Sequence, residues 1–104
     1  MQDAGIIDDA VYFIEKLRGD VAKITFIKKS GELRYMKCTL DFNLIPKGDK
    51  PKSVNIPQIL KLIRKNGIAR VYDLEKKGWR SVPFNKTEYM ELEKENKRYR
   101  IRAK

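Results

Sequence analysis

Residues 71–84, VYDLEKKGWRSVPF, decide the fold of this chain. The first four residues have strand character, residues 75–78 form a polar turn that ends in glycine, and residues 79–84 return to strand character. The stretch also holds Trp79, the only tryptophan, which is large enough to anchor a small core. It therefore predicts a two-stranded hairpin.

The composition indicates one small globular domain. A chain of 104 residues can bury one modest core, and a small barrel of about five strands would suit it. No apolar run is long enough to span a membrane, and the acidic start MQDAGIIDDA lacks the core of a signal peptide. A single cysteine, Cys38, excludes an internal disulfide and fits a reducing compartment. We therefore expect a soluble protein of the cytoplasm.

The charge is distributed unevenly along the chain. Residues 1–20 hold five acidic and two basic residues, a balance of −3, so with a net charge of +10 the remaining residues carry +13. The last eight residues, KRYRIRAK, contain five cations and no acid. A basic body of this kind favours a polyanionic partner, although lysine and arginine also serve simply to solvate a surface.

A short helix is expected to begin at Asp8, after loosely ordered residues 1–7. Asp8 suits the N-cap, Ile7 and Tyr12 have the spacing of a hydrophobic staple, and Gly19 ends the helix. One apolar stripe has helical spacing: Ala10, Phe13, Ile14 and Leu17.

A second helix is predicted over residues 56–66. Pro57 suits its first turn, and Asn66-Gly67 is a stop signal. The apolar stripe consists of Ile56, Ile59, Leu60 and Ile63. Residues 43–55, which come before it, are rich in proline, glycine and lysine and predict a basic surface loop.

Residues 21–28 and 33–42 predict a long antiparallel hairpin. Alternation places Met36, Cys38, Leu40 and Phe42 on the core face. It places Tyr35, Lys37, Thr39 and Asp41 toward solvent. Cys38 is then a buried small hydrophobe with a protonated thiol rather than a nucleophile.

After the central hairpin, which Pro83 is expected to end or to place at a sheet edge, residues 89–93 predict a short closing strand. Residues 93–97 predict either a turn or the end of a helix, and residues 99–102 either an edge strand or a disordered tail. The expected organisation is an N-terminal segment with a helix (1–20), a small barrel with an inserted helix (21–93) and a basic tail (94–104).

Two stretches together resemble a known family. They are KITFIKKSGELRYMKCTLDFNLIP, residues 23–46, and the hairpin of residues 71–84. They resemble WYL_2, a family of small phage and bacterial proteins described as Sm-like, SH3-like β-barrels. The shared pieces are M-x-C-T-L at residues 36–40, Leu-Ile-Pro at residues 44–46, and a V-Y/F-D…W-R-S-F hairpin. The last piece departs at Val82, where phenylalanine is usual, and at Pro83.

This resemblance implies a fold and a setting but no activity. The implied fold is mainly β (α+β), a five-stranded SH3-like or Sm-like barrel, and the implied setting is a phage or mobile element in a bacterium or infected host cell. The resemblance covers about a third of the chain and leaves helix 56–66, as an apparent insertion, and the basic tail unexplained. It brings no cofactor and no site residue with it.

Catalytic and metal-binding patterns are missing from the sequence. With no histidine and one cysteine, neither a structural zinc site nor a Cys/His nucleophile is expected, and the six glycines form no phosphate-binding loop. The carboxylates suit caps and solvated faces rather than a two-metal nuclease site. We expect neither an enzyme nor a cofactor.

Two functions remain open. The first is binding of nucleic acid, with single strands favoured over duplex, through cations interleaved with aromatic rings. The candidates are Lys28, Lys29, Arg34, Tyr35 and Lys37 of the first hairpin, Tyr72 and Arg80 of the central hairpin, and Arg98, Tyr99, Arg100 and Arg102 of the basic end. The tyrosines also suit half-buried edge positions. The second function is docking on an acidic surface of a host or viral protein.

Overall fold

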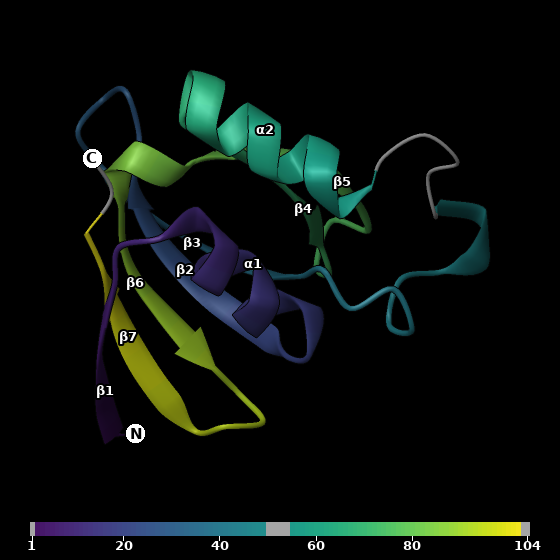
Figure 1. Cartoon of the computed structure of the whole chain (residues 1–104), viewed down its shortest axis with the longest axis horizontal. Coiled ribbons are helices and arrows are strands. Elements are labelled where there is room, and N and C mark those ends of the chain that lie inside the picture. The colour runs from purple at the N-terminus through teal and green to yellow at the C-terminus, as the bar shows by residue number, and fades with distance from the viewer. Residues whose placement is uncertain (1, 50–54, 103–104) are drawn as a thin grey trace.

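A computed structural model describes residues 2–49 and 55–102 of the chain, with an α+β fold (Figure 1). Seven strands form one mixed sheet: β1 (Gln2–Ile7), β2 (Val21–Ile27), β3 (Leu33–Thr39), β4 (Ile68–Asp73), β5 (Gly78–Pro83), β6 (Thr87–Leu92) and β7 (Lys97–Ile101). Their order across the sheet is β1-β7-β6-β2-β3-β4-β5, with β1 and β7 parallel and all other neighbours antiparallel.

Two helices lie over the inner face of the curved sheet (Figure 1). Helix α1 (Ala10–Arg18) and helix α2 (Ile56–Asn66) contribute their apolar stripes to one core, to which each strand from β1 to β7 also contributes. Two 3₁₀ turns, η1 (Lys47–Asp49) and η2 (Phe84–Lys86), complete the elements. In the described part of the chain no helix combines the length and the apolar character needed to cross a bilayer.

The central hairpin is confirmed as β4 and β5. Tyr72 faces Trp79 across the pair, and their rings meet edge to face with centroids 5.7 Å apart. The side chain of Asp73 accepts hydrogen bonds from the backbone N–H groups of Glu75 and Lys76, both at 2.9 Å, which fixes the turn. An aspartate in this role is typical of tight turns.

The first helix is confirmed, but its predicted cap is wrong by one residue. Asp9, not Asp8, is the N-cap, and its carboxylate accepts the N–H of Val11 at 2.9 Å. The predicted staple is therefore wrong too, because Ile7 belongs to β1 and does not precede the cap. The second helix has the predicted bounds, is capped by Asn55, and ends at Gly67 in the left-handed conformation.

Residues 2–7 form a strand, so the prediction of a loosely ordered start is wrong. Strand β1 pairs in parallel with β7, and Ile7 lies beside Ile101 with no exposed surface. Asp3 forms an ion pair with Arg98 at 2.8 Å. Residues 97–101 of the basic tail likewise form a strand, β7, and β1 lies outside it, so β7 is not the edge of the sheet.

The five predicted strands are all present as β2 to β6, and residues 93–96 form the turn into β7. Alternation correctly predicted which side chains of β3 face the core and which face solvent, with one error at Thr39. Thr39 is fully buried rather than solvent-facing, because its hydroxyl donates to the Asp20 carbonyl at 2.8 Å and accepts the N–H of Asp41 at 2.9 Å.

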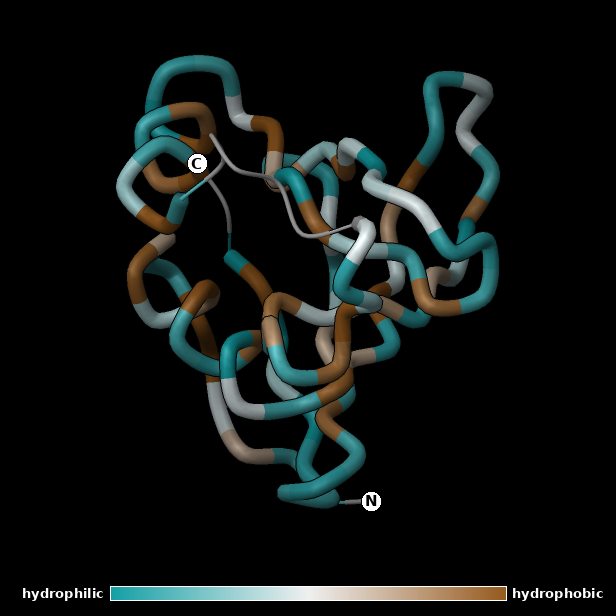
Figure 2. The backbone as a smooth tube through the Cα atoms, turned by 90° about the vertical axis from the view of Figure 1, so that its right-hand side faces the viewer, coloured by the Kyte–Doolittle hydropathy of each residue, from teal (hydrophilic) through white to brown (hydrophobic). Residues whose placement is uncertain are grey.

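The predicted surface loop, residues 43–55, includes η1, and its residues 50–54 lie outside the described part of the chain. Ile45 of this loop is buried. Figure 2 shows how hydropathy switches between apolar and polar over short stretches of the backbone. This is the pattern expected of strands with one covered and one open face.

Candidate nucleic-acid interface

The outer face of the sheet, away from both helices, carries interleaved aromatic and cationic side chains. Register places them on this face, because residues directly opposite in antiparallel strands point the same way. We call the following set the tyrosine face: Lys23 and Thr25 of β2, Tyr35 and Lys37 of β3, Tyr89 and Glu91 of β6, and Arg98 and Arg100 of β7. Glu91, the acid of this set, lies between Lys23 and Arg98.

One row of the tyrosine face crosses four neighbouring strands. Thr25 lies opposite Tyr35 on one side and Tyr89 on the other, and Tyr89 lies opposite Arg100. The tyrosines are exposed by 58% and 37%, whereas Thr25 between them is exposed by 8%. The Tyr35 and Tyr89 rings therefore both protrude from the sheet surface, and the small side chain of Thr25 separates them.

Each exposed ring has a cation against it. The Nζ atom of Lys23 lies 4.8 Å from the centre of the Tyr35 ring, and the Cζ atom of Arg98 lies 5.1 Å from that of Tyr89. Both distances suit a cation–π contact. Arg98 is also held in place by Asp3, which accepts from its Nε at 2.9 Å.

A groove continues from one end of the tyrosine face. Two cavities, of about 480 and 620 Å³, share Ile27 and Lys86 as lining residues, and Arg100 lines the smaller one. We call them together the basic groove. Within the described part of the chain its charged lining residues are Lys28, Lys29, Lys86, Arg100, Arg102 and one acid, Glu88. Because Arg100 belongs to both surfaces, the tyrosine face and the basic groove adjoin at this residue. We call the two surfaces together the path.

The structure brings most of the predicted site residues together on this path. Lys28, Lys29, Arg100 and Arg102 line the basic groove, and Tyr35, Lys37 and Arg98 lie on the tyrosine face. The charge of Lys37 is partly neutralised there, because its Nζ atom forms an ion pair with the Glu93 carboxylate at 3.1 Å.

Four predicted residues lie elsewhere or are covered. Tyr72 is exposed by only 1% and Tyr99 by 5%, so neither ring is open to a base in this structure. Arg34 lies opposite Phe26 on the other side of β3, and Arg80 lies opposite Val71 in the central hairpin. Neither arginine lies on the tyrosine face or lines the basic groove.

Three cationic or aromatic residues of the path were missed: Lys23, Tyr89 and Lys86. Lys23 and Tyr89 share a face with Tyr35 only through pairing of β2 with both β3 and β6. Alternation in residues 21–27 could have assigned Lys23 to the outer face. Lys86 follows Pro83 in η2, and no sequence pattern places that turn beside the end of β2.

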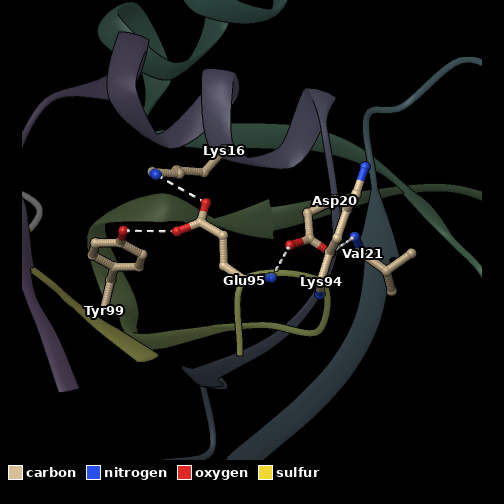
Figure 3. A network of polar contacts seen from close by, with 6 residues as sticks. All are labelled: Lys16, Asp20, Val21, Lys94, Glu95 and Tyr99. Atoms are coloured by element: carbon tan, nitrogen blue, oxygen red, sulfur yellow. Dashed lines mark hydrogen bonds and ion pairs between the residues drawn. The ribbon is translucent and has the colours of Figure 1, made fainter. Parts of the chain in front are cut away.

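A polar network fixes the turn that joins β6 to β7 (Figure 3). Asp20 is exposed by 6%, and its carboxylate accepts the backbone N–H groups of Val21, Lys94 and Glu95 at 2.7, 2.8 and 3.0 Å. These three bonds bind the start of β2 to the turn. They hold β7, and with it Arg98 and Arg100, in register.

Glu95 links the same turn to α1. Its carboxylate accepts Lys16 Nζ at 2.9 Å and the Tyr99 hydroxyl at 3.1 Å. The hydrogen bond from Lys16 holds the pKa of Glu95 below its usual value, and the bond to Glu95 raises the pKa of Lys16. Burial raises the pKa of the Tyr99 hydroxyl. The Lys16 and Glu95 charges are paired with each other and the Asp20 carboxylate is bonded to backbone N–H groups, which favours a structural role for the network.

The described residues contain no group of three or more cysteine, aspartate or glutamate side chains that could hold a metal ion. Cys38 is buried, and burial, with a further contribution from Asp73, raises the pKa of its thiol. A protonated thiol in the core is a poor nucleophile.

Comparison with known proteins agrees with the resemblance in the sequence. The family model described as WYL_2, Sm-like SH3 beta-barrel fold, matches residues 11–86. The matched span begins in α1, contains α2 and ends in η2. No curated protein and no solved structure matches the chain.

Proposed function

The chain belongs to the WYL_2 family, of the Sm-like SH3 beta-barrel fold, and on this premise we propose that it binds single-stranded nucleic acid along the tyrosine face and the basic groove. One observation carries the proposal. Two exposed tyrosines, Tyr35 and Tyr89, flank Thr25, each with a cation against its ring, and lead into a groove lined by five cations.

The proposed recognition combines stacking with phosphate contacts. Tyr35 and Tyr89 lie two strand spacings apart, about 10 Å, so they would stack on two different bases of one strand. Lys23, Arg98 and Arg100 lie between and beside these rings and would contact the intervening phosphates. Bases must be unpaired to reach the rings, which favours a single strand over a duplex.

The finer fold belongs to the same proposal. We take strands β2 to β6 to form the five-stranded barrel that the family description names. The order β6-β2-β3-β4-β5 supports it, as does the cavity that Phe26 and Ile27 of β2 line together with Pro83 of β5. The protein acts, in this proposal, as a binding protein without catalytic activity, in the cytoplasm of a bacterium or an infected cell.

Fluorescence anisotropy with labelled single-stranded DNA, single-stranded RNA and duplex, over a salt series, tests the proposal. Five phosphate contacts predict a log–log slope steeper than about −3 for a single strand, at ~0.7 per contact. Replacing both rings, Tyr35→Ala with Tyr89→Ala, should weaken binding at least tenfold, since each stacked base contributes about 1–3 kcal/mol.

Tyr12→Ala is the matched control, because Tyr12 is exposed by 40% but lies on α1. It should leave the affinity unchanged. Absence of binding at low salt, or equal affinity of the double variant and the native chain, would remove the proposal.

A second function is supported by a different observation. Ile6 and Leu33, exposed by 47% and 57%, lie at the margins of the same sheet face. Apolar side chains among cations suit docking on an acidic protein surface. Under this function the double tyrosine variant would lose a protein partner and leave the behaviour toward nucleic acid untouched.

A further inference from the structure

The larger of the two cavities in the basic groove differs chemically from the rest of the path. It measures about 620 Å³, and Phe26, Ile27, Ile68 and Pro83 form its apolar part. We call it the apolar pocket. Its volume lies in the range of small-molecule sites, about 300–1,000 Å³.

Every charged residue that lines the apolar pocket in the described part of the chain is a lysine: Lys28, Lys29 and Lys86. Lys28 and Lys29 follow the end of β2, and Lys86 ends η2, so the ammonium groups come from two separate elements. The described residues offer no acidic partner within the pocket. An apolar interior with cations around it complements a ligand that has a flat apolar body and an attached anion.

A nucleotide has that composition, with a flat base and an anionic phosphate. A strand bound along the path would bring its nucleotides close to the apolar pocket. Arg100 and Lys86 connect the tyrosine face to the pocket, with Ile27 lining both cavities. A strand stacked on Tyr35 and Tyr89 would therefore run past the pocket as it leaves the sheet. The base that follows meets no exposed tyrosine among the described residues that line the pocket, but it has an apolar space to enter.

We propose that the apolar pocket takes one base, turned out of the stack of a bound single strand, while Lys28, Lys29 and Lys86 hold its flanking phosphates. The inference rests on the function proposed above and adds to it a site for an individual nucleotide. It also gives the protein a means of selecting among bases, since a pocket discriminates by shape where stacking does not.

Ser30→Phe tests the pocket without touching the core. Ser30 lines the pocket, is exposed, and lies in the turn between β2 and β3. A phenylalanine there occupies the space offered to the base. Ser81→Phe, at an exposed position of β5 that lines neither cavity, is the matched control. We expect Ser30→Phe to weaken single-strand binding about tenfold, the loss of one held base, and Ser81→Phe to leave it unchanged.

Methyl NMR spectra give a second readout. Adenosine, guanosine, cytidine and uridine 5′-monophosphates should shift the Ile68 methyl signal of the native chain, and the shift should disappear in Ser30→Phe. Inorganic phosphate alone should leave that signal in place, since it has no apolar body.

The outcomes separate the two proposals. If a single strand binds through the tyrosines, but Ser30→Phe binds as tightly as the native chain and no mononucleotide shifts Ile68, the pocket proposal is overturned and the proposed function stands. If no oligonucleotide binds, both are overturned.

Discussion

Gly67 shows how one residue joins two elements, α2 and η2. It ends α2 with φ = 67°, its N–H donates to the Ile63 carbonyl at 2.8 Å, and its own carbonyl accepts the N–H of Phe84 at 2.8 Å. A Cβ atom added here would also collide with the side-chain amide of Asn85. Glycine is therefore required both by the backbone conformation and by the neighbouring chain.

The substitution Gly67→Ala should lower the free energy of unfolding by more than about 1 kcal/mol, because alanine at a positive φ is strained and Asn85 must move. Urea denaturation measures the change. Gly48→Ala is the control, since nothing lies near a Cβ atom added there, and it should stay within about 0.5 kcal/mol of the native chain. Equal stability of the two variants would contradict the requirement for glycine at position 67.

Individual residues also show where the reading of the sequence succeeded. Burial of Cys38 followed from alternation alone, because a period of two is a property of every strand. The exposure of Tyr35 followed in the same way. The burial of Tyr72 and Tyr99 did not, since whether a ring is covered depends on neighbours such as Trp79 and Tyr12 that only the folded chain brings beside them.

Among the elements, those built from neighbouring residues were predicted and the one built from distant residues was not. Both hairpins and both helices have signals within their own stretches, such as turn residues, caps and periodic stripes. Strand β1 has none, because its partner, β7, lies at the other end of the described chain. Two parallel strands are not joined by a hairpin turn, so no local sequence signal marks their pairing.

Strand β1 offers a comparison within one element. Ile7 is fully buried beside Ile101, whereas Ile6, the preceding residue, is exposed by 47%. Ile7→Ala should therefore destabilise the protein by about 2–5 kcal/mol, the usual cost of removing a buried isoleucine side chain.

Ile6→Ala, the control on the same strand, should change stability by less than about 0.5 kcal/mol. Thermal or urea unfolding of both variants makes the comparison. Similar losses for the two would mean that β1 does not sit in the observed register.

At the scale of the whole molecule, Glu95 connects the sheet to α1 through Lys16 (Figure 3). The hydrogen bond from Lys16 lowers the pKa of Glu95, so folding favours the ionised carboxyl. A lowered pKa contributes stability above the usual glutamate value, about 4.3, and the contribution is lost as pH falls through the lower pKa of the folded state.

Glu95→Gln should accordingly lower the melting temperature at pH 7, and the difference from the native chain should shrink as the pH is brought below about 4. Circular dichroism over a pH series measures it. Glu15→Gln, at an exposed position on α1, should show no such trend. A difference that stays constant with pH would show that Glu95 acts by packing and not by charge.

The proposed interface also belongs to this scale, and the sequence predicted its composition better than its layout. The cations and Tyr35 could be named from charge and alternation, but Tyr89 and Lys86 join them only when β6 and η2 are placed beside β2. The position of an element in a sheet is set by pairing over long distances, which a single sequence does not display.

The parallel pairing of β1 with β7 has a consequence for synthesis. Of the described strands, β1 is synthesised first and β7 last. Strand β1 therefore lacks its pairing partner while the strands between them fold. An unpaired strand is open to mispairing with other chains. Here the unpaired strand carries Asp3 and Gly5 and has only Ile6 and Ile7 as large apolar residues, a composition that resists such mispairing. The low β-propensity and small apolar content of β1 therefore limit mispairing of the nascent chain until β7 has been synthesised.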